Sequence, residues 1–217
     1  VILMSGGVVE CPWAGKVKGI LYAGLSGQAG AQAIANILYG KVNPSGKLAE
    51  SWPINYEDCA TAAFYGKEKD AIYREGIYVG YRYYDKYQIP VQFPFGHGLS
   101  YTAFSYGDMQ VKESDGQTFK VQIPVTNTGK LAGKETVELY VGETEVSPEN
   151  PVKELKGFCK LSLAPGETKY AEFELTADAF RHFDEKTDAW KVIAGSYTIY
   201  IGSSVSDIRS VTTITIK

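Results

Sequence analysis

The sequence predicts two units of different fold class: an α/β unit with a partly parallel sheet over residues 1–100, and an all-β sandwich over residues 101–217. Three observations predict this division. Short apolar strands alternate with a helical pattern in the first unit, and short strands separated by turns repeat through the second. Between them, residues 93–101 combine glycines, a proline and aromatic rings, which is typical of a rigid corner between two units.

The first unit begins with two short apolar segments, residues 1–4 and 19–23, which we predict to be strands. The run at 1–4 is wholly apolar and ends at a serine and two glycines, a pattern typical of a parallel strand buried on both faces. Buried strands rarely open a chain, because termini normally lie at the surface. We therefore expect the sequence to be a fragment whose preceding part is missing.

A helix is predicted between residues 26 and 39, with Ser26 as its N-cap and Gly40 as the left-handed residue after its end. A type I turn at 43–46 and a further strand at 47–52 follow. Strand, helix, turn and strand in this order indicate an α/β unit. The apolar residues at helical spacing are Ala33, Ile34, Ile37 and Leu38.

The glycines between residues 24 and 30 suggest a phosphate-binding loop, but their spacing is neither GxGxxG nor that of a P-loop with its lysine. We favour close packing of strand against helix over nucleotide binding, and we expect no cofactor.

Tyrosines are concentrated between residues 73 and 87. Residues 76–84 have strong strand propensity, which predicts a strand with Ile77, Val79, Tyr81 and Tyr83 on one face. The rings could form a platform on which a sugar stacks, but we favour their packing against a neighbouring domain.

The second unit shows the alternation of a half-buried sheet. In residues 118–126 the side chains of Phe119, Val121, Ile123 and Val125 are predicted to point inward. Turn-forming segments rich in proline and glycine separate the later strands, which predicts a sandwich of immunoglobulin or fibronectin type III character. The later predicted strands are residues 136–141, 170–175, 196–201 and 211–216.

Composition excludes several partners. The net charge of −3 gives no basic surface for nucleic acid or an anionic membrane, and no apolar run approaches the length of a membrane span. Cys11, Cys59 and Cys159 are odd in number and widely spaced, so we expect reduced, buried thiols and no metal site. We expect a cytoplasmic, bacterial location rather than secretion.

Several long motifs in order resemble glycoside hydrolase family 3, the β-glucosidase family, over essentially the whole chain. The corner at 93–101 resembles the family's join between its α/β-sandwich domain and its fibronectin type III-like domain. The resemblance implies that residues 1–100 are the C-terminal part of the α/β-sandwich and residues 101–217 the complete last domain. The motifs are GQAG at 27–30, AIANILYG at 33–40, VNPSGKL at 42–48, YREGIYVGYRYYD at 73–85, FPFGHGLSY at 93–101, VTNTG at 125–129, LYV at 139–141 and LKGF at 155–158.

The resemblance implies retaining hydrolysis of terminal β-D-glucosyl residues by two carboxylates. The family's nucleophile lies in a barrel domain that nothing here resembles, and its acid/base loop lies upstream of residue 1. Glu10, Glu50 and Glu75 are the carboxylates to test here, and we expect structural roles for all three. We therefore assign no catalytic residue, and we expect the missing N-terminal portion, with the barrel, to be the principal partner.

Two tryptophans, Trp13 and Trp52, are the candidates for an outer substrate subsite. His97 lies between two glycines of the corner, where we expect it to fix the turn by hydrogen bonding.

An alternative function is a carbohydrate-binding module, which would require a planar row of exposed rings; Phe180, Phe183 and Trp190 give no clear row. A homo-oligomer is a further alternative, since an incomplete parallel sheet exposes an edge.

Overall fold

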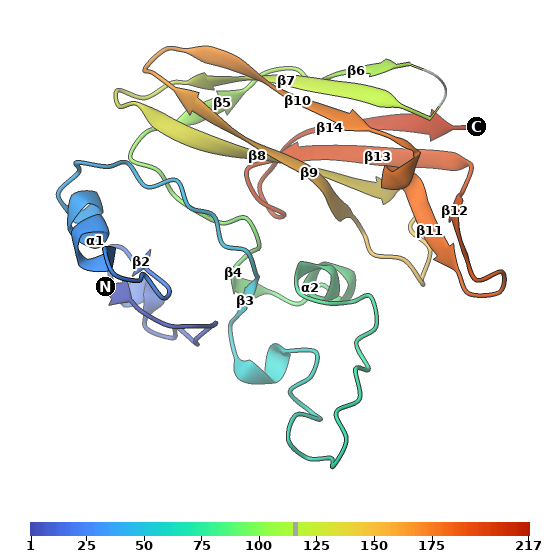
Figure 1. Ribbon diagram of the computed structural model, residues 1–217, viewed down its shortest axis with the longest axis horizontal. Helices are drawn as coiled ribbons and strands as arrows, with labels where there is room; N and C mark the ends of the chain where they lie inside the picture. The colour runs from blue at the N-terminus through green and yellow to red at the C-terminus, as the bar shows by residue number, and fades with distance from the viewer. Residues whose placement is uncertain (115–116) are drawn as a thin grey trace.

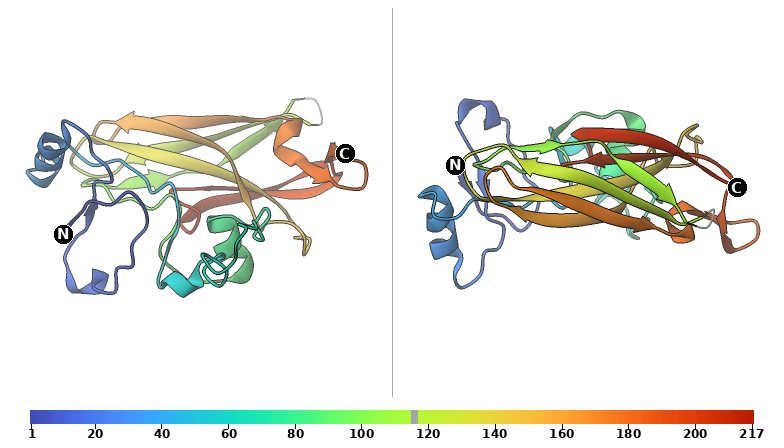
Figure 2. Two further views of the ribbon diagram at one scale, coloured as in Figure 1. Left: turned by 60° about the horizontal axis from the view of Figure 1, so that its bottom comes forward. Right: turned by 90° about the horizontal axis from the view of Figure 1, so that it is seen from above.

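The computed structural model describes residues 1–114 and 117–217, and Figure 1 shows the β-sandwich with the N-terminal unit lying along one side of it. In the left view of Figure 2 the N-terminal unit lies to the left of and below the sandwich, and in the right view it lies behind the sandwich. The sandwich carries long strands, whereas the N-terminal unit is made of short elements joined by extended chain.

Two small sheets organise the N-terminal unit. Strands β1 (Ile2–Leu3) and β2 (Leu21–Tyr22) pair in parallel, with the 3₁₀ helix η1 (Ala14–Lys16) between them and helix α1 (Gly30–Leu38) after them. Strands β3 (Trp52–Pro53) and β4 (Val91–Phe93) pair antiparallel. The chain between β3 and β4 contains the 3₁₀ helix η2 (Tyr56–Asp58) and helix α2 (Tyr81–Tyr87).

The sandwich consists of two antiparallel sheets. In one, the order is β10-β7-β5, and β6 also pairs with β7; in the other it is β14-β13-β8-β9. A 3₁₀ helix and a hairpin of β11 and β12 lie between β10 and β13. The bounds are β5 (Phe104–Tyr106), β6 (Gln110–Glu113), β7 (Phe119–Asn127), β8 (Gly133–Glu143), β9 (Glu154–Leu163), β10 (Thr168–Leu175), η3 (Ala177–Phe180), β11 (Arg181–Asp184), β12 (Ala189–Val192), β13 (Gly195–Gly202) and β14 (Ile208–Ile216).

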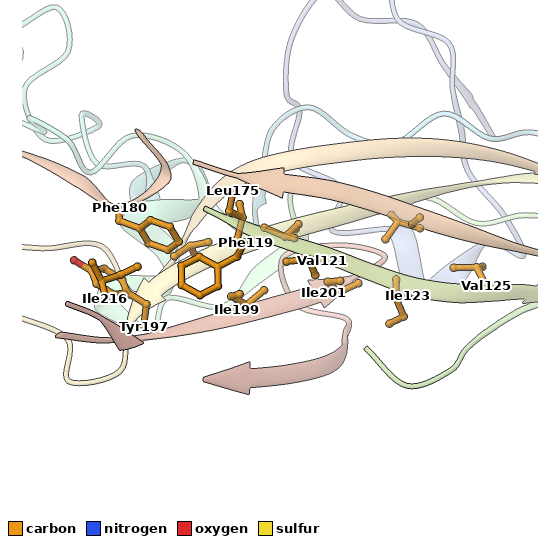
Figure 3. Packing of buried hydrophobic residues seen from close by; sticks show 14 of the residues in the cluster. Phe119, Val121, Ile123, Val125, Leu175, Phe180, Tyr197, Ile199, Ile201 and Ile216 are labelled. Carbon is orange, nitrogen blue, oxygen red and sulfur yellow. The ribbon is translucent and has the colours of Figure 1, made fainter. Parts of the chain in front are cut away.

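The main hydrophobic core lies between these two sheets. Phe180 makes edge-to-face contacts with Phe119 and Tyr197 at one end of it, with ring centroids 5.8 and 5.1 Å apart (Figure 3). The inward residues predicted for β7 are all buried, so that prediction is confirmed. Regular alternation makes β7 predictable from sequence, because this strand buries every second side chain; β8, by contrast, is buried at nearly every position.

The predicted strand at 76–84 is wrong. Helix α2 occupies residues 81–87, and the residues before it form a turn. Gly76 and Gly80 have φ angles of +56° and +61°, outside the region that a strand allows. The tyrosines then lie at helical spacing, so Ile77, Val79, Tyr81 and Tyr83 do not share a strand face.

Two further expectations need correction in the N-terminal unit. Helix α1 begins at Gly30 rather than at residue 26, and no side chain caps its N-terminus. Ser26 instead packs against Gly30: a Cβ added at Gly30 would lie 2.2 Å from the Ser26 hydroxyl oxygen. The predicted strand at 47–52 is reduced to its last residue, Trp52, because the backbone of Leu48 bonds to the corner instead. Gly40 does take the predicted left-handed conformation.

The strand at residues 1–4 is also exposed rather than buried on both faces. β1 has one partner strand here, and the side chains of Val1, Ile2 and Met4 are exposed. Among the described residues, no helix is both long and apolar enough to cross a membrane.

Candidate functional site

The three carboxylates proposed for testing lie in separate surroundings. Glu10 is exposed and accepts a hydrogen bond from the backbone N–H of Tyr56. Glu50 is exposed in a bend, and Glu75 is half-buried in the turn before α2. No hydrogen bond joins any two of these three described side chains, and the structural role expected for each of them stays a prediction.

Trp13 and Trp52, proposed as substrate contacts, lie in different settings. Trp13 is half-buried at the start of η1. Trp52 is only 2% exposed and lies between Tyr22 and Phe93, with centroid distances of 5.0 and 5.9 Å. The ring of Trp52 therefore packs in the N-terminal unit, and a role in sugar binding stays a prediction for both tryptophans.

The corner at residues 93–101 joins the two units by backbone hydrogen bonds. The N–H of Gly96 donates to the carbonyl of Leu48 (2.8 Å), and the N–H of Leu48 donates to the carbonyl of His97 (2.9 Å). From the sandwich, the N–H of Val205 donates to the carbonyl of Phe95 (3.1 Å). The corner therefore bonds to both units.

His97 contributes to this corner through its backbone and by stacking. Its N–H donates to the carbonyl of Pro94 (3.0 Å), which closes the turn as expected. Its imidazole stacks on Phe93, with centroids 5.4 Å apart and planes 22° apart. Burial, and then the positive charge of Lys47, lower the pKa of His97, so the ring is neutral near pH 7.

Gly98 allows the corner to approach the turn at residues 43–46. A Cβ added at Gly98 would lie 2.3 Å from the carbonyl oxygen of Gly46, which is a backbone atom and not a flexible side chain.

Replacing Gly98 by alanine is expected to destabilise the chain by about 2 kcal/mol, because the backbone must shift to admit the methyl group. Chemical denaturation followed by circular dichroism measures this. Gly15→Ala is the matched control, since an added Cβ meets nothing within 4 Å at Gly15, and a loss there as large as at Gly98 would contradict the explanation.

A buried polar cluster connects Lys47 of the N-terminal unit to Glu135 and Tyr106 of the sandwich. Lys47 Nζ donates to the carbonyl of Ser203 (3.0 Å) and lies 3.9 Å from Glu135 Oε1, which also accepts a hydrogen bond from the Tyr106 hydroxyl (2.8 Å). Burial raises the pKa of Glu135, and the charge of Lys47 opposes that rise. One lysine of the N-terminal unit thus compensates charge buried in the sandwich.

Glu138 is the second buried carboxylate of this cluster. The Tyr140 hydroxyl donates to its Oε2, and Gly96 packs so closely that an added Cβ would meet the carboxylate at 2.3 Å. Burial raises the pKa of Glu138, and the bond from Tyr140 and the charge of Lys47 offset this only in part.

Glu138→Gln is expected to become more stable relative to the unchanged chain as the pH rises from about 4 to about 8. Because the pKa of Glu138 is higher in the folded chain than in the unfolded one, the stability that it contributes is full below the unfolded pKa and is lost as the pH rises through the folded pKa. Glutamine does not ionise, so the stability of the variant does not fall in this way as the pH rises. Urea unfolding at several pH values measures the trend; a constant difference between the two chains would contradict it, and the exposed Glu172→Gln is the control.

Helix α2 attaches the N-terminal unit to the loop between β8 and β9. We call five contacts the α2 clamp, because each joins a residue of α2 to residues 147–155. Lys86 Nζ donates to the carbonyls of Ser147 (2.8 Å) and Asn150 (2.6 Å); the N–H of Leu155 donates to the Tyr81 hydroxyl (2.8 Å); Lys153 pairs with Asp85 (2.6 Å); and Arg82 pairs with Glu154 (3.0 Å).

The neighbouring positive charges favour the ionised form of Glu154 in the α2 clamp. Burial by itself raises the pKa of Glu154, but Lys156 and Arg82 outweigh it, so the pKa is lowered and the carboxylate is ionised. Tyr81 also packs on Phe95 and Tyr140, with centroid distances of 4.9 and 5.9 Å. The expectation that tyrosines of this segment pack against a neighbouring domain is thus met at Tyr81. Because residues 76–84 were predicted as a strand, the clamp was not predicted. The helical spacing of residues 81, 82 and 85 is the sequence signal that could have indicated it.

The rings considered for a carbohydrate-binding face do not form a planar row. Phe180 is buried in the core, whereas Phe183 and Trp190 are exposed on the β11–β12 hairpin. The planes of these two rings meet at 68°. Among the described residues no group of histidine, cysteine or acidic side chains could hold a metal ion.

The fold therefore defines a class of protein in which an α/β unit packs against a β-sandwich through a buried junction. Comparisons with known proteins then define the family. The model described as "Glycosyl hydrolase family 3 C-terminal domain" matches residues 1–81, and that of the "Fibronectin type III-like domain" matches residues 135–205. The chain belongs to glycoside hydrolase family 3 and corresponds to the C-terminal part of its members.

Individual relatives agree along nearly the whole chain. The thermostable beta-glucosidase B of Acetivibrio thermocellus is 47% identical over 96% of this chain, and an exo-alpha-(1->6)-L-arabinopyranosidase of Bifidobacterium breve is 40% identical over 100% of it. A crystal structure of a Bifidobacterium adolescentis GH3 beta-glucosidase matches 99% of the chain with a TM-score of 0.95 and 43% identity. The chain spans only 28%, 29% and 32% of these three proteins.

Proposed function

We propose that this chain is the C-terminal part of a retaining β-glucosidase that hydrolyses terminal non-reducing β-D-glucosyl residues. Its own role in that enzyme is structural, and the catalytic carboxylates lie in the part of the polypeptide outside this chain. Relatives named as β-glucosidases support the activity of the whole protein.

The junction between the two units is the observation that carries the structural role. Lys47 lies against the carbonyl of Ser203 and against Glu135 of the sandwich, and the α2 clamp attaches the loop between β8 and β9. A buried junction of this kind fixes one unit relative to the other, because a shift between the units would leave Glu135 without its positively charged partner. The sandwich therefore braces the N-terminal unit.

The test compares the intact parent protein with the 217-residue chain. We expect the parent to release nitrophenol from 4-nitrophenyl β-D-glucopyranoside and, by proton NMR, to form the β-anomer of glucose first, as retention requires. The chain alone is expected to be inactive. Activity of the chain that is lost in Glu10→Gln, Glu50→Gln or Glu75→Gln would overturn the structural role.

Substrate specificity is tested in the same assay. One relative is named as an arabinopyranosidase rather than a glucosidase, so 4-nitrophenyl α-L-arabinopyranoside is the comparison substrate. A larger kcat/KM for the arabinoside would contradict the glucosidase assignment while leaving the family unchanged.

We also propose a cytoplasmic location. Cys11, Cys59 and Cys159 are all free, which suits a reducing compartment. The expectation that all three thiols are buried is correct for Cys11 alone, because Cys59 and Cys159 are half-buried. Fractionation of the source cells tests this, and recovery of the parent in the culture medium would contradict it.

A further inference from the structure

Residues 61–79, which we call the lobe, extend away from the sandwich between η2 and α2 (Figure 1). Large apolar side chains in this short segment face solvent. Tyr65 and Tyr73 are 77% and 84% exposed. Exposed apolar residues that are scattered singly need no explanation, but a cluster of them marks an interaction surface. The exposed apolar residues of the lobe are Phe64, Tyr65, Ile72, Tyr73, Ile77 and Val79.

The lobe is organised by its own contacts, so these side chains are presented by a defined structure. Both terminal nitrogens of Arg74 bond to the carboxylate of Glu68, at 2.9 and 3.0 Å, and the guanidinium lies 4.6 Å from the centre of the Phe64 ring. Gly66 and Gly76 provide left-handed turns with φ of +71° and +56°.

The sandwich anchors the end of the lobe. The Tyr78 hydroxyl donates to the carbonyl of Pro148 (3.1 Å), and the α2 clamp begins three residues later at Tyr81. Lys86 bonds to two carbonyls of the same loop. The position of the lobe therefore depends on the loop between β8 and β9.

One unpaired polar atom of the lobe also indicates that the lobe lacks a neighbour. In the described part of the chain, Trp52 Nε1 and Glu75 Oε2 are the buried side-chain polar atoms without a hydrogen-bond partner. Trp52 is enclosed by the N-terminal unit itself, whereas Glu75 is a half-buried residue of the lobe. A buried polar atom without a partner is costly, so a neighbour that packs on the lobe is expected to supply the partner of Glu75.

The length of the relatives indicates which part of the protein covers this surface. The chain spans about 30% of its relatives' length, so about two thirds of such a protein lies outside it. We infer that the lobe is a docking surface for that outside part of the same polypeptide, and that the sandwich holds it in position through the α2 clamp. The inference rests on the proposed function, in which this chain is one part of a longer enzyme.

Hydroxyl-radical footprinting of the intact parent protein tests the docking. Tyr65 and Tyr73 are expected to be oxidised at least about tenfold more slowly than Tyr170, since a closed interface exposes its side chains only by local opening. Tyr170 is the matched reference, because it is the same residue type and 52% exposed on the outer face of β10. Equal oxidation rates would overturn the inference, as would protection that appears only when glucose is added.

Photo-crosslinking identifies the occupant. Benzoylphenylalanine placed at position 65 or 73 of the parent is expected to link within one molecule to residues outside the present chain. Links between two molecules would assign the surface to a second copy instead and overturn the inference. The same preparation is assayed for glucosidase activity, so an inactive parent with a protected lobe contradicts the proposed function alone.

A clamp variant tests the role of the sandwich. Lys86→Gln removes the charged donor that bonds to Ser147 and Asn150, and we expect faster oxidation of Tyr65 and Tyr73 in the parent. Lys169→Gln is the matched control, since Lys169 pairs with Glu167 at an exposed site of the sandwich, and it is expected to change nothing. Unchanged protection in Lys86→Gln would show that the clamp does not position the lobe.

Discussion

Replacing Lys47 by methionine is expected to destabilise the folded chain by about 3 kcal/mol near neutral pH, because removal of one partner leaves a buried charge uncompensated. Lys47 and Glu135 are both nearly buried, with 13% and 8% of their side chains exposed. Methionine fills similar volume but donates no hydrogen bond to the carbonyl of Ser203. Urea unfolding followed by circular dichroism measures the loss.

The same variant has an expected pH dependence. Burial raises the pKa of Glu135, and Lys47 partly opposes this, so the pKa should rise further without the lysine. As the pH falls, Glu135 takes up a proton and its charge no longer needs compensation. The destabilisation of Lys47→Met should therefore shrink in acid, and a penalty that stays constant would indicate lost packing instead of lost charge.

Lys169→Met is the control for Lys47→Met. The pair of Lys169 with Glu167 is exposed, and solvent screens such pairs, so a change of no more than about 0.5 kcal/mol is expected.

The second large effect is expected at Trp52. Trp52→Ala should destabilise the chain by about 3–5 kcal/mol, because it empties a buried site between two aromatic rings. The indole is 2% exposed and contacts Tyr22 of β2 and Phe93 of β4, so the cavity would lie where both small sheets meet. Thermal or urea unfolding measures the change.

Trp190→Ala provides a matched control with the same substitution. Trp190 is 65% exposed on the β11–β12 hairpin, so a loss of no more than about 1 kcal/mol is expected. Equal losses at both tryptophans would mean that the indole of Trp52 does not support the packing of the N-terminal unit.

The sandwich was the more predictable unit because each strand carries its own signal. Alternation in residues 118–126 predicts β7 and its four buried apolar side chains. The hairpin of β11 and β12 and the long strand β9 were not predicted. β9 alternates between exposed and more buried side chains only over residues 158–163, and its first four residues are all half-buried.

The N-terminal unit was less predictable because its short elements depend on distant partners. Tyrosine-rich residues 76–84 have high strand propensity, yet two glycines with positive φ end any strand there, and contacts with the loop between β8 and β9 stabilise a helix. Local propensity is a weak prior when tertiary contacts oppose it. The corner was predicted as a join, but its partners, Leu48 and Val205, were not.

The sequence by itself determined the family, the fold classes of the two units and the inward face of β7, because ordered motifs and period-two alternation are local properties of the chain. Tertiary structure alone decided that Trp52 is buried, that Lys47 neutralises charge inside the sandwich, and that α2 is a helix clamped to the loop between β8 and β9. Each of these depends on residues at least 30 positions apart in sequence, the separation of Tyr22 and Trp52, and no local pattern encodes such contacts.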